Sequence, residues 1–182
     1  MERGLNGERA MQRVMVIGCP GSGKSTFARA LHRLTGLPLY YLDRMNWNAD
    51  RTTVEKAVFR ARLEETVRRR EWIIDGNYGS TIELRLRACD TVFFLDYPPQ
   101  VCLEGVRERR GRPREDMPWA EREGEEDEEF LAFIRNYGAQ SRPKVLELLA
   151  QYPHKEIHVF TCREEAQAFL RQLREGAPRK EQ

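Results

Sequence analysis

Residues 18–25 read GCPGSGKS, and this segment constrains the fold more than any other part of the chain. It matches the phosphate-binding pattern G-x-x-x-x-G-K-[ST], whose small residues let successive backbone N–H groups converge on phosphate oxygens. An apolar run at residues 14–17 precedes it and an amphipathic stretch at 24–35 follows it. This order is typical of a strand, a loop and a helix whose N-terminus faces an anion. The segment therefore predicts a nucleotide site.

Each position of this loop has a predicted role in nucleotide binding. Lys24 is expected to reach the outer phosphates, and the Ser25 hydroxyl is expected to ligate Mg²⁺. The remaining positions contribute mainly backbone. The complete set of predicted nucleotide contacts is Gly18, Cys19, Pro20, Gly21, Ser22, Gly23, Lys24, Ser25 and Thr26.

Short apolar runs alternate with longer amphipathic ones along the chain, a pattern typical of an α/β fold with a parallel sheet. The predicted strands are residues 14–18, 39–42, 72–75, 91–96 and 157–160. The predicted helices are residues 24–35, 54–70, 81–88, 99–110, 130–152 and 164–174. Within 130–152, Pro143 is expected to kink or divide the helix.

The length of 182 residues, with 40% hydrophobic and 33% charged content, suits one compact domain. We expect this domain at 13–175, between an N-terminal tail at 1–12 and a C-terminal tail at 176–182.

A net charge of +2 disfavours a general nucleic-acid partner. No apolar run is long enough to span a membrane, and the N-terminal residues lack the pattern of a secretory signal. Four cysteines without metal spacing fit reduced thiols. These features predict a cytoplasmic protein.

Acidic residues follow several predicted strands, where a metal ion and an acceptor would lie. Asp75 and Asp96 compete for the role of holding Mg²⁺ through water, and each is also a candidate helix cap. We favour Asp75 because Gly76 follows it. Asp43 ends another strand and is expected to orient an acceptor hydroxyl, accept its proton or join the metal's water shell, with a turn as the alternative. Trp47 is a candidate wall of the acceptor pocket.

Arginines gather between residues 107 and 114, where five of eight positions are Arg. The next fifteen residues contain nine acids, so the two halves partly neutralise each other. We predict a lid at about 107–129, because guanidinium groups that close over phosphates stabilise the charge of phosphoryl transfer. Arg109 is the lid's candidate, and Arg135 and Arg142, seven residues apart, would share a helix face toward the phosphates. A solvated or ion-paired role is the alternative for each. Arg85 is a candidate for binding an anionic group of the acceptor.

The chain resembles adenylate-kinase-like P-loop kinases, and most closely the group called DNA topology modulation protein or FlaR-like. The resemblance runs from residue 11 to about 173 and includes WIIDGNY at 72–78, LRL at 84–86, FLDYP at 94–98, RPREDM at 112–117 and SRP at 141–143. It implies a three-layer α/β/α fold, a five-stranded parallel sheet of order 2-3-1-4-5 and an Arg-rich lid. It also implies ATP or GTP with Mg²⁺.

Two departures from that family bear on the acceptor. The sequence NYG at 77–79 replaces Phe-Pro-Arg, and so removes an Arg that holds the acceptor phosphate in nucleoside-monophosphate kinases. Gly105 stands where many relatives carry a lid-helix Arg. Leu42 and Asp43 look more like the corresponding segment of shikimate- and gluconate-type kinases, which implies a small hydroxylated acceptor.

The leading interpretation is a kinase that moves the γ-phosphoryl group of ATP, with Mg²⁺, to a hydroxyl or phosphate acceptor. Its catalytic residues would be Lys24, Asp43, Arg109, Arg135 and Arg142. The alternative is a nucleotide-dependent regulatory switch with slow hydrolysis that acts on a protein or DNA partner. A monomer and a homodimer are both compatible with the sequence.

Overall fold

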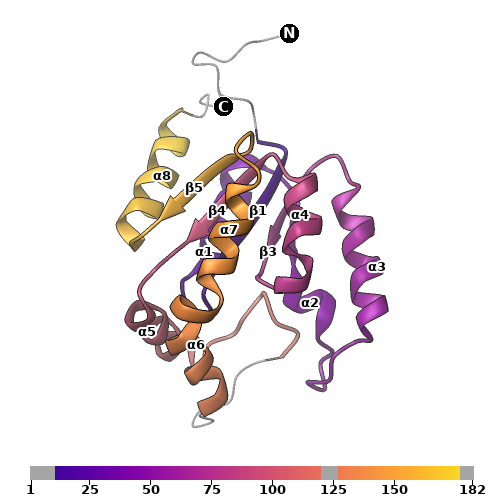
Figure 1. Ribbon diagram of the computed structural model, residues 1–182, viewed down its shortest axis with the longest axis vertical. Helices are drawn as coiled ribbons and strands as arrows, with labels where there is room; N and C mark the ends of the chain where they lie inside the picture. The colour runs from indigo at the N-terminus through magenta and orange to yellow at the C-terminus, as the bar shows by residue number, and fades with distance from the viewer. Residues whose placement is uncertain (1–10, 120–126, 177–182) are drawn as a thin grey trace.

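A computed structural model describes residues 11–119 and 127–176 of the chain (Figure 1). The predicted lid is therefore described only in part, because residues 120–126 lie outside the described residues. Most of the two predicted tails, residues 1–10 and 177–182, lies outside them as well. The division into one domain and two tails stays a prediction.

Five parallel strands form one sheet in the order β2-β3-β1-β4-β5, as the sequence predicted. The strands are β1 (Arg13–Gly18), β2 (Leu39–Tyr41), β3 (Trp72–Asp75), β4 (Thr91–Leu95) and β5 (Glu156–Phe160). In the central register, Val16 lies beside Asp75 of β3 and Phe93 of β4. Because all strands are parallel, the segments that follow β1, β2, β3 and β4 meet at one edge of the sheet.

The central strands are buried on both faces, which explains their continuous apolar sequences. In β1, Val14 and Val16 belong to one hydrophobic cluster, whereas Met15 and Ile17 belong to the other. Successive side chains of a strand point to opposite faces, so β1 supplies both layers of the core.

Helices cover both faces of the sheet (Figure 1). One face carries residues of α1 (Lys24–Thr35), α5 (Pro99–Arg109), α6 (Glu128–Gln140) and α8 (Arg163–Gly176). The other face carries residues of α2 (Leu42–Asn46), α3 (Lys56–Val67), α4 (Ile82–Ala88) and α7 (Arg142–Ala150). A short 3₁₀ turn, η1 (Gly79–Thr81), precedes α4. The predicted three-layer architecture is confirmed.

Several elements are shorter than the sequence-based prediction. The strand expected to reach residue 42 ends at Tyr41, and Leu42 begins the short helix α2 with its side chain in the core. The helix expected over 54–70 spans Lys56–Val67. The expectation that Pro143 kinks or divides the helix over 130–152 is confirmed, because α6 ends at Gln140 and α7 begins at Arg142 with Pro143 in its first turn. Proline has no N–H to continue the preceding helix but fits a first turn.

No helix within residues 11–119 and 127–176 has the length and apolar composition needed to cross a lipid bilayer. The cytoplasmic location stays a prediction.

Candidate active site

The phosphate-binding loop connects the end of β1 with the start of α1. Gly23 adopts a left-handed conformation (φ 88°) and α1 starts immediately after it with Lys24 and Ser25. The first turn of α1 contains no acidic residue and receives no side-chain cap. The partial positive charge of this 12-residue helix is therefore not offset by an acidic side chain of its own first turn. This is the arrangement that a phosphate-binding loop requires.

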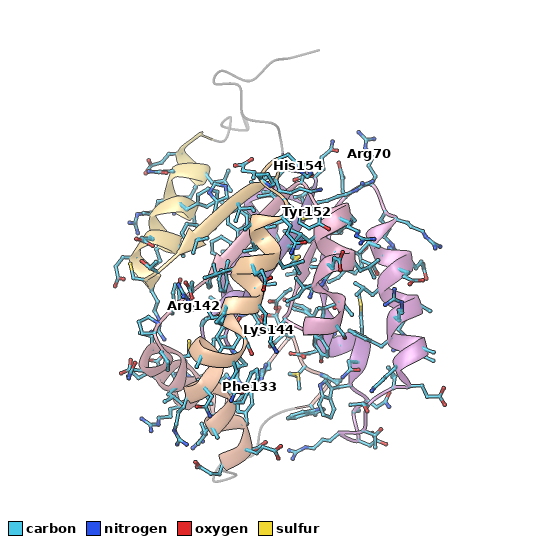
Figure 2. All side chains as sticks on the ribbon, viewed as in Figure 1. Arg70, Phe133, Arg142, Lys144, Tyr152 and His154 are labelled. Atoms are coloured by element: carbon cyan, nitrogen blue, oxygen red, sulfur yellow. The ribbon has the colours of Figure 1, made fainter. Side chains whose placement is uncertain are left out.

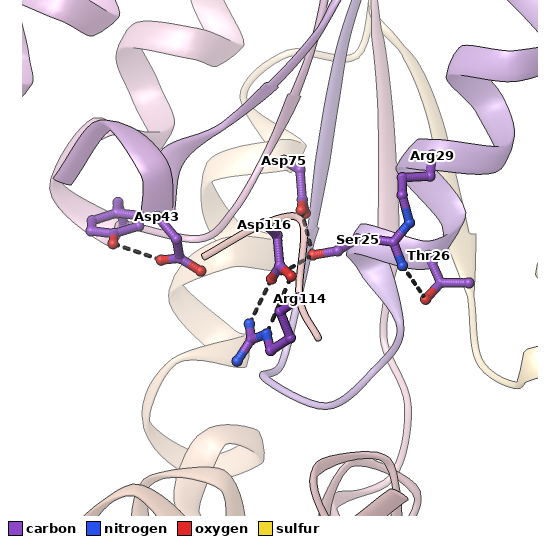
Figure 3. Close-up of polar contacts among 8 residues, drawn as sticks. Ser25, Thr26, Arg29, Asp43, Asp75, Arg114 and Asp116 are labelled. Carbon is purple, nitrogen blue, oxygen red and sulfur yellow. Dashed lines mark hydrogen bonds and ion pairs between the residues drawn. The ribbon is translucent and has the colours of Figure 1, made fainter. Parts of the chain in front are cut away.

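Asp75 and Ser25 meet beside this loop (Figure 3). The Ser25 hydroxyl donates to Asp75 Oδ2 at 2.5 Å. Only 4% of the Asp75 surface is exposed, and its Oδ1 is buried without a hydrogen-bond partner in the structure. Burial raises the pKa of Asp75 to about 6, although the Lys24 charge and the Ser25 hydrogen bond oppose the rise. A buried carboxylate oxygen with no donor, next to a hydroxyl, fits the water shell of a divalent cation.

Asp96, the alternative metal partner, is engaged elsewhere. Arg142 Nε donates to Asp96 Oδ1 at 2.8 Å and to Oδ2 at 2.9 Å. Two predicted functional residues thus bind each other at the start of α7, where Figure 2 shows Arg142. The structure places Asp75 rather than Asp96 in contact with Ser25.

Asp116 is a site residue that the sequence analysis missed. It is 7% exposed and its Oδ2 lies 3.3 Å from the Ser25 hydroxyl, which Asp75 also contacts (Figure 3). Arg114 Nη2 donates to Asp116 Oδ2 at 2.5 Å. Burial alone would raise the pKa of Asp116, but the Arg114 hydrogen bond and charge outweigh it, and the pKa lies below the ordinary value. The only sequence signal was its membership of the RPREDM segment.

Arg109, Arg135 and Arg142, the three arginines predicted to approach the phosphates, lie in different surroundings. Arg109 lines both cavities described below. Arg135 pairs with Glu128 at 2.5 Å, with about half of its side chain exposed, and it lines neither cavity. The expectation that Arg135 and Arg142 share a face assumed one continuous helix. The break between α6 and α7 removes that geometry, and we correct the assignment of both residues accordingly.

Asp43 lies at the acceptor side of the loop, on α2. Tyr78, which follows β3, donates its hydroxyl to Asp43 Oδ1 at 2.7 Å. Burial and the neighbouring Asp43 charge raise the pKa of Tyr78, so its proton is firmly held. Tyr78 thus fixes one carboxylate oxygen of Asp43. Trp47 directly follows α2, and its ring packs edge-on against the Trp119 ring, with the two ring centroids 6.0 Å apart.

Arg85 lies inside the core rather than in the acceptor pocket, which corrects its predicted role. The side chain is 0% exposed and donates to the backbone carbonyl oxygens of Gly76 (2.7 Å) and Asn77. It therefore holds the loop after β3. From that loop, the Asn77 side chain accepts a hydrogen bond of 3.0 Å from the Gly18 amide.

The helix α5 lies against the phosphate-binding loop at two glycines. A Cβ atom at Gly105 would lie 2.0 Å from the Gly21 carbonyl oxygen, and one at Gly21 would lie 2.0 Å from the Cys102 carbonyl oxygen. No side chain fits at either position. This contact explains why position 105 carries no arginine.

Two cavities meet at the start of α1. One, of about 510 Å³, is lined by the loop, the first turns of α1 and residues of α8, including Arg163 and Gln167. The other, of about 490 Å³, is lined by Asp43, Trp47 and Tyr78. Five residues line both: Lys24, Ser25, Arg109, Arg114 and Asp116. Among the residues that the structure describes, no group of three His, Cys, Asp or Glu side chains forms a ready metal site.

Comparisons with known proteins bear on the fold. No family model matches the sequence, and no curated protein matches it. A solved structure of shikimate kinase from Bacteroides thetaiotaomicron superimposes with a TM-score of 0.57, 22% identity and coverage of 91% of this chain and 98% of that chain. Shikimate kinase from Acinetobacter baumannii in complex with shikimate gives a TM-score of 0.53, 20% identity and coverage of 90% and 93%. At these identities the likeness shows the fold alone, a five-stranded parallel sheet of order β2-β3-β1-β4-β5 between two layers of helices.

Proposed function

We propose that this protein is a kinase that transfers the γ-phosphoryl group of ATP to a hydroxyl group of a small molecule. The observation that carries the proposal is that Lys24 and Ser25 line both cavities. A nucleotide in the first cavity and an acceptor in the second would therefore meet at these two side chains. The shikimate kinases that share the fold support a hydroxyl acceptor, since one of them is in complex with shikimate.

The loop residues would bind and position the nucleotide. Backbone N–H groups of residues 18–26 would hold the phosphates, and the Lys24 ammonium would follow the transferred group toward the acceptor. Arg109 lines both cavities and would offset negative charge on that group. Arg135 and Arg142 have no part in this proposal, because their placement lies outside both cavities.

Asp43 would prepare the acceptor. One of its oxygens accepts from Tyr78, and the other is proposed to accept a hydrogen bond from the acceptor hydroxyl. The acceptor oxygen then forms a bond to the γ-phosphorus as the bond to the bridging oxygen of ADP breaks. The hydroxyl proton passes to the Asp43 carboxylate. Charge and atoms balance in this step without a further reactant.

Ser25 and Asp75 would hold Mg²⁺, Ser25 directly and Asp75 through water. The partnerless Asp75 Oδ1 supports this assignment. When bound, Mg²⁺ would neutralise charge on the outer phosphates. Asp116 also contacts the Ser25 hydroxyl, and we propose that it joins this water shell. We further propose that the chain belongs to the FlaR-like group, that it uses ATP rather than GTP, and that a lid spans about 107–129.

Replacing Lys24 tests the proposal. We expect Lys24→Ala to lower kcat for phosphoryl transfer at least about a hundredfold, because it removes the mobile positive charge from the transition state. Circular dichroism should show an unchanged helix content. Lys144→Ala is the matched control, since Lys144 is an exposed lysine at the start of α7 (Figure 2). Near-normal transfer by the Lys24 variant would refute the assignment.

Incubation with ATP, Mg²⁺ and a panel of candidate acceptors separates the kinase from the alternative, a regulatory switch. A kinase releases ADP faster when the correct acceptor is added. A switch gives only slow, acceptor-independent hydrolysis, together with partner binding that changes with the nucleotide. Affinity for DNA that falls steeply with salt would favour the DNA-binding form of the switch.

A further inference from the structure

The cavity on the acceptor side has aromatic walls. Trp47, Tyr78, Trp119, Phe130 and Phe133 all line it, and they come from four separate places in the chain: the end of α2, the loop after β3, the lid segment and α6. Such a convergence of rings is not needed to bind a small polyol, whose recognition depends on hydrogen bonds. Resting on the function proposed above, we propose that the acceptor is an alcohol carried by an aromatic or heteroaromatic ring.

The two tryptophans give the wall its shape. Their rings meet at 86°, and Arg51 lies over the Trp119 ring with its guanidinium carbon 4.8 Å from the centroid. Among the residues that the structure describes, Trp119 Nε1 is buried without a hydrogen-bond partner. A buried indole N–H normally has an acceptor, because leaving it unpaired costs free energy. A ring nitrogen or ring substituent oxygen of the acceptor would pair with it only if the indole edge turned toward the cavity on binding.

Asp43 offers an alcohol a hydrogen-bond acceptor in this cavity, because Tyr78 engages only one of its two carboxylate oxygens. The lining also contains five cations, so the case for an alcohol rests on Asp43 and the rings and not on the charge of the cavity. These cations are Lys24, Arg51, Arg109, Arg110 and Arg114. Asp43 lies where the hydroxyl of the acceptor would react, and the aromatic rings line the rest of the cavity. This arrangement fits a molecule with one polar end and one flat apolar end.

The size of the cavity agrees with such a molecule. About 490 Å³ lies within the range of roughly 300–1,000 Å³ that holds drug-sized ligands. Part of this space is next to Lys24 and Ser25 and would receive the transferred phosphoryl group. The remainder, beside Trp47, Trp119 and Phe130, is the part assigned to the ring.

Tryptophan fluorescence tests the binding directly and without turnover. The chain has three tryptophans, and the third, Trp72, is 0% exposed and donates to the Val67 carbonyl oxygen. A change in emission on adding a ligand therefore reports on Trp47 and Trp119. With a nonhydrolysable ATP analogue and Mg²⁺ present, we expect benzyl and pyridyl alcohols and nucleosides to give saturable changes. Shikimate and gluconate should give none.

Variants locate the site. Trp119→Leu and Trp47→Leu each keep an apolar side chain but remove the ring, and each should weaken binding of the best aromatic alcohol by up to about tenfold, the size expected for one aromatic contact. The two residues come from different elements, so a folding defect in one variant leaves the other as a test. Tyr152→Leu is the control, because Tyr152 follows α7 at the opposite end of the molecule from Phe133 and does not line the cavity (Figure 2).

Transfer assays separate this inference from the function on which it rests. Phosphorylation of aromatic alcohols, reduced by the Trp119 and Trp47 variants, supports both. Phosphorylation of shikimate or gluconate with no response to aromatic alcohols keeps the kinase and overturns the aromatic acceptor. Preference for nucleoside monophosphates over nucleosides overturns it as well. Absence of both an emission change and phosphoryl transfer with every aromatic alcohol also overturns the inference.

Discussion

At the scale of single residues, Asp75 carries an unfavourable charge in the absence of a cation. It is buried, its Oδ1 has no partner, and Asp116 and Asp43 add negative charge nearby. The raised pKa of about 6, against an ordinary 3.8, means that the folded protein favours the protonated carboxyl. The stability gained from protonation is fully present below pH 3.8 and is lost as the pH rises through about 6. A site of this kind gains from a bound cation.

We therefore expect Asp75→Asn to stabilise the metal-free protein above pH 6 and to leave its stability nearly unchanged below pH 4. A shift of about two pKa units corresponds to roughly 2–3 kcal/mol of unfolding free energy. Urea denaturation at a series of pH values measures the difference. With Mg²⁺ and nucleotide present the order should reverse, since the variant loses a carboxylate of the metal's water shell. A difference that does not change with pH would contradict the assigned ionisation.

Single residues also show what a sequence can predict. The loop, Lys24, Ser25 and Asp75 were predictable because a spacing pattern and a strand end fix their chemistry. Arg85 was misassigned because residue type does not reveal burial, and only the fold shows that its guanidinium binds backbone carbonyls. Asp116 was missed because it sits in a run of charges that resembles an ordinary solvated surface.

At the scale of elements, the close contact between α5 and the phosphate-binding loop is the feature with the clearest consequence. The helix carries Arg109, so its distance from the loop sets where that guanidinium lies. The helices and strands themselves were largely predictable from periodicity. The break at Ser141 was indicated by Pro143, but the short helix α2 was not, because five residues give no periodic signal.

Gly105→Ala tests this contact. The added methyl group would lie 2.0 Å from the Gly21 carbonyl oxygen, so we expect a loss of roughly 1–3 kcal/mol of stability and weaker nucleotide binding. Gly138→Ala is the matched control in α6, where a Cβ meets nothing within 4 Å. A helical Gly→Ala change at an open position should stabilise by about 0.5–1 kcal/mol. Thermal unfolding and nucleotide titration measure both, and equal behaviour of the two variants would disprove the contact.

At the scale of the whole molecule, one sheet forms the centre of both hydrophobic clusters. Neither layer of helices can keep its packing if the strands separate, because Val14 and Met15 of the same strand face opposite layers. The parallel order could be predicted only through the family resemblance, since periodicity reveals strands but not their neighbours.

The shared sheet predicts one cooperative unfolding transition for the described domain. In a Trp47→Phe, Trp119→Phe double variant, Trp72 becomes the only tryptophan and reports on one cluster. Its emission and the far-ultraviolet circular dichroism should change at the same urea concentration. Mg²⁺ and nucleotide should move both curves together by mass action. Separate midpoints would show that the two layers unfold independently.

The buried guanidinium of Arg85 has a consequence for how sequences with this fold diversify. The Arg85 guanidinium donates hydrogen bonds to the backbone carbonyl oxygens of Gly76 and Asn77. The backbone path of the loop after β3 therefore depends little on the side chains that this loop carries. The Asn77 side chain accepts a hydrogen bond from Gly18 of the phosphate-binding loop, and the Tyr78 hydroxyl donates one to Asp43. Under the proposed function, substitutions at position 78 would release Asp43 Oδ1 and alter the acceptor side of the cavity, while the backbone that Arg85 holds keeps its path.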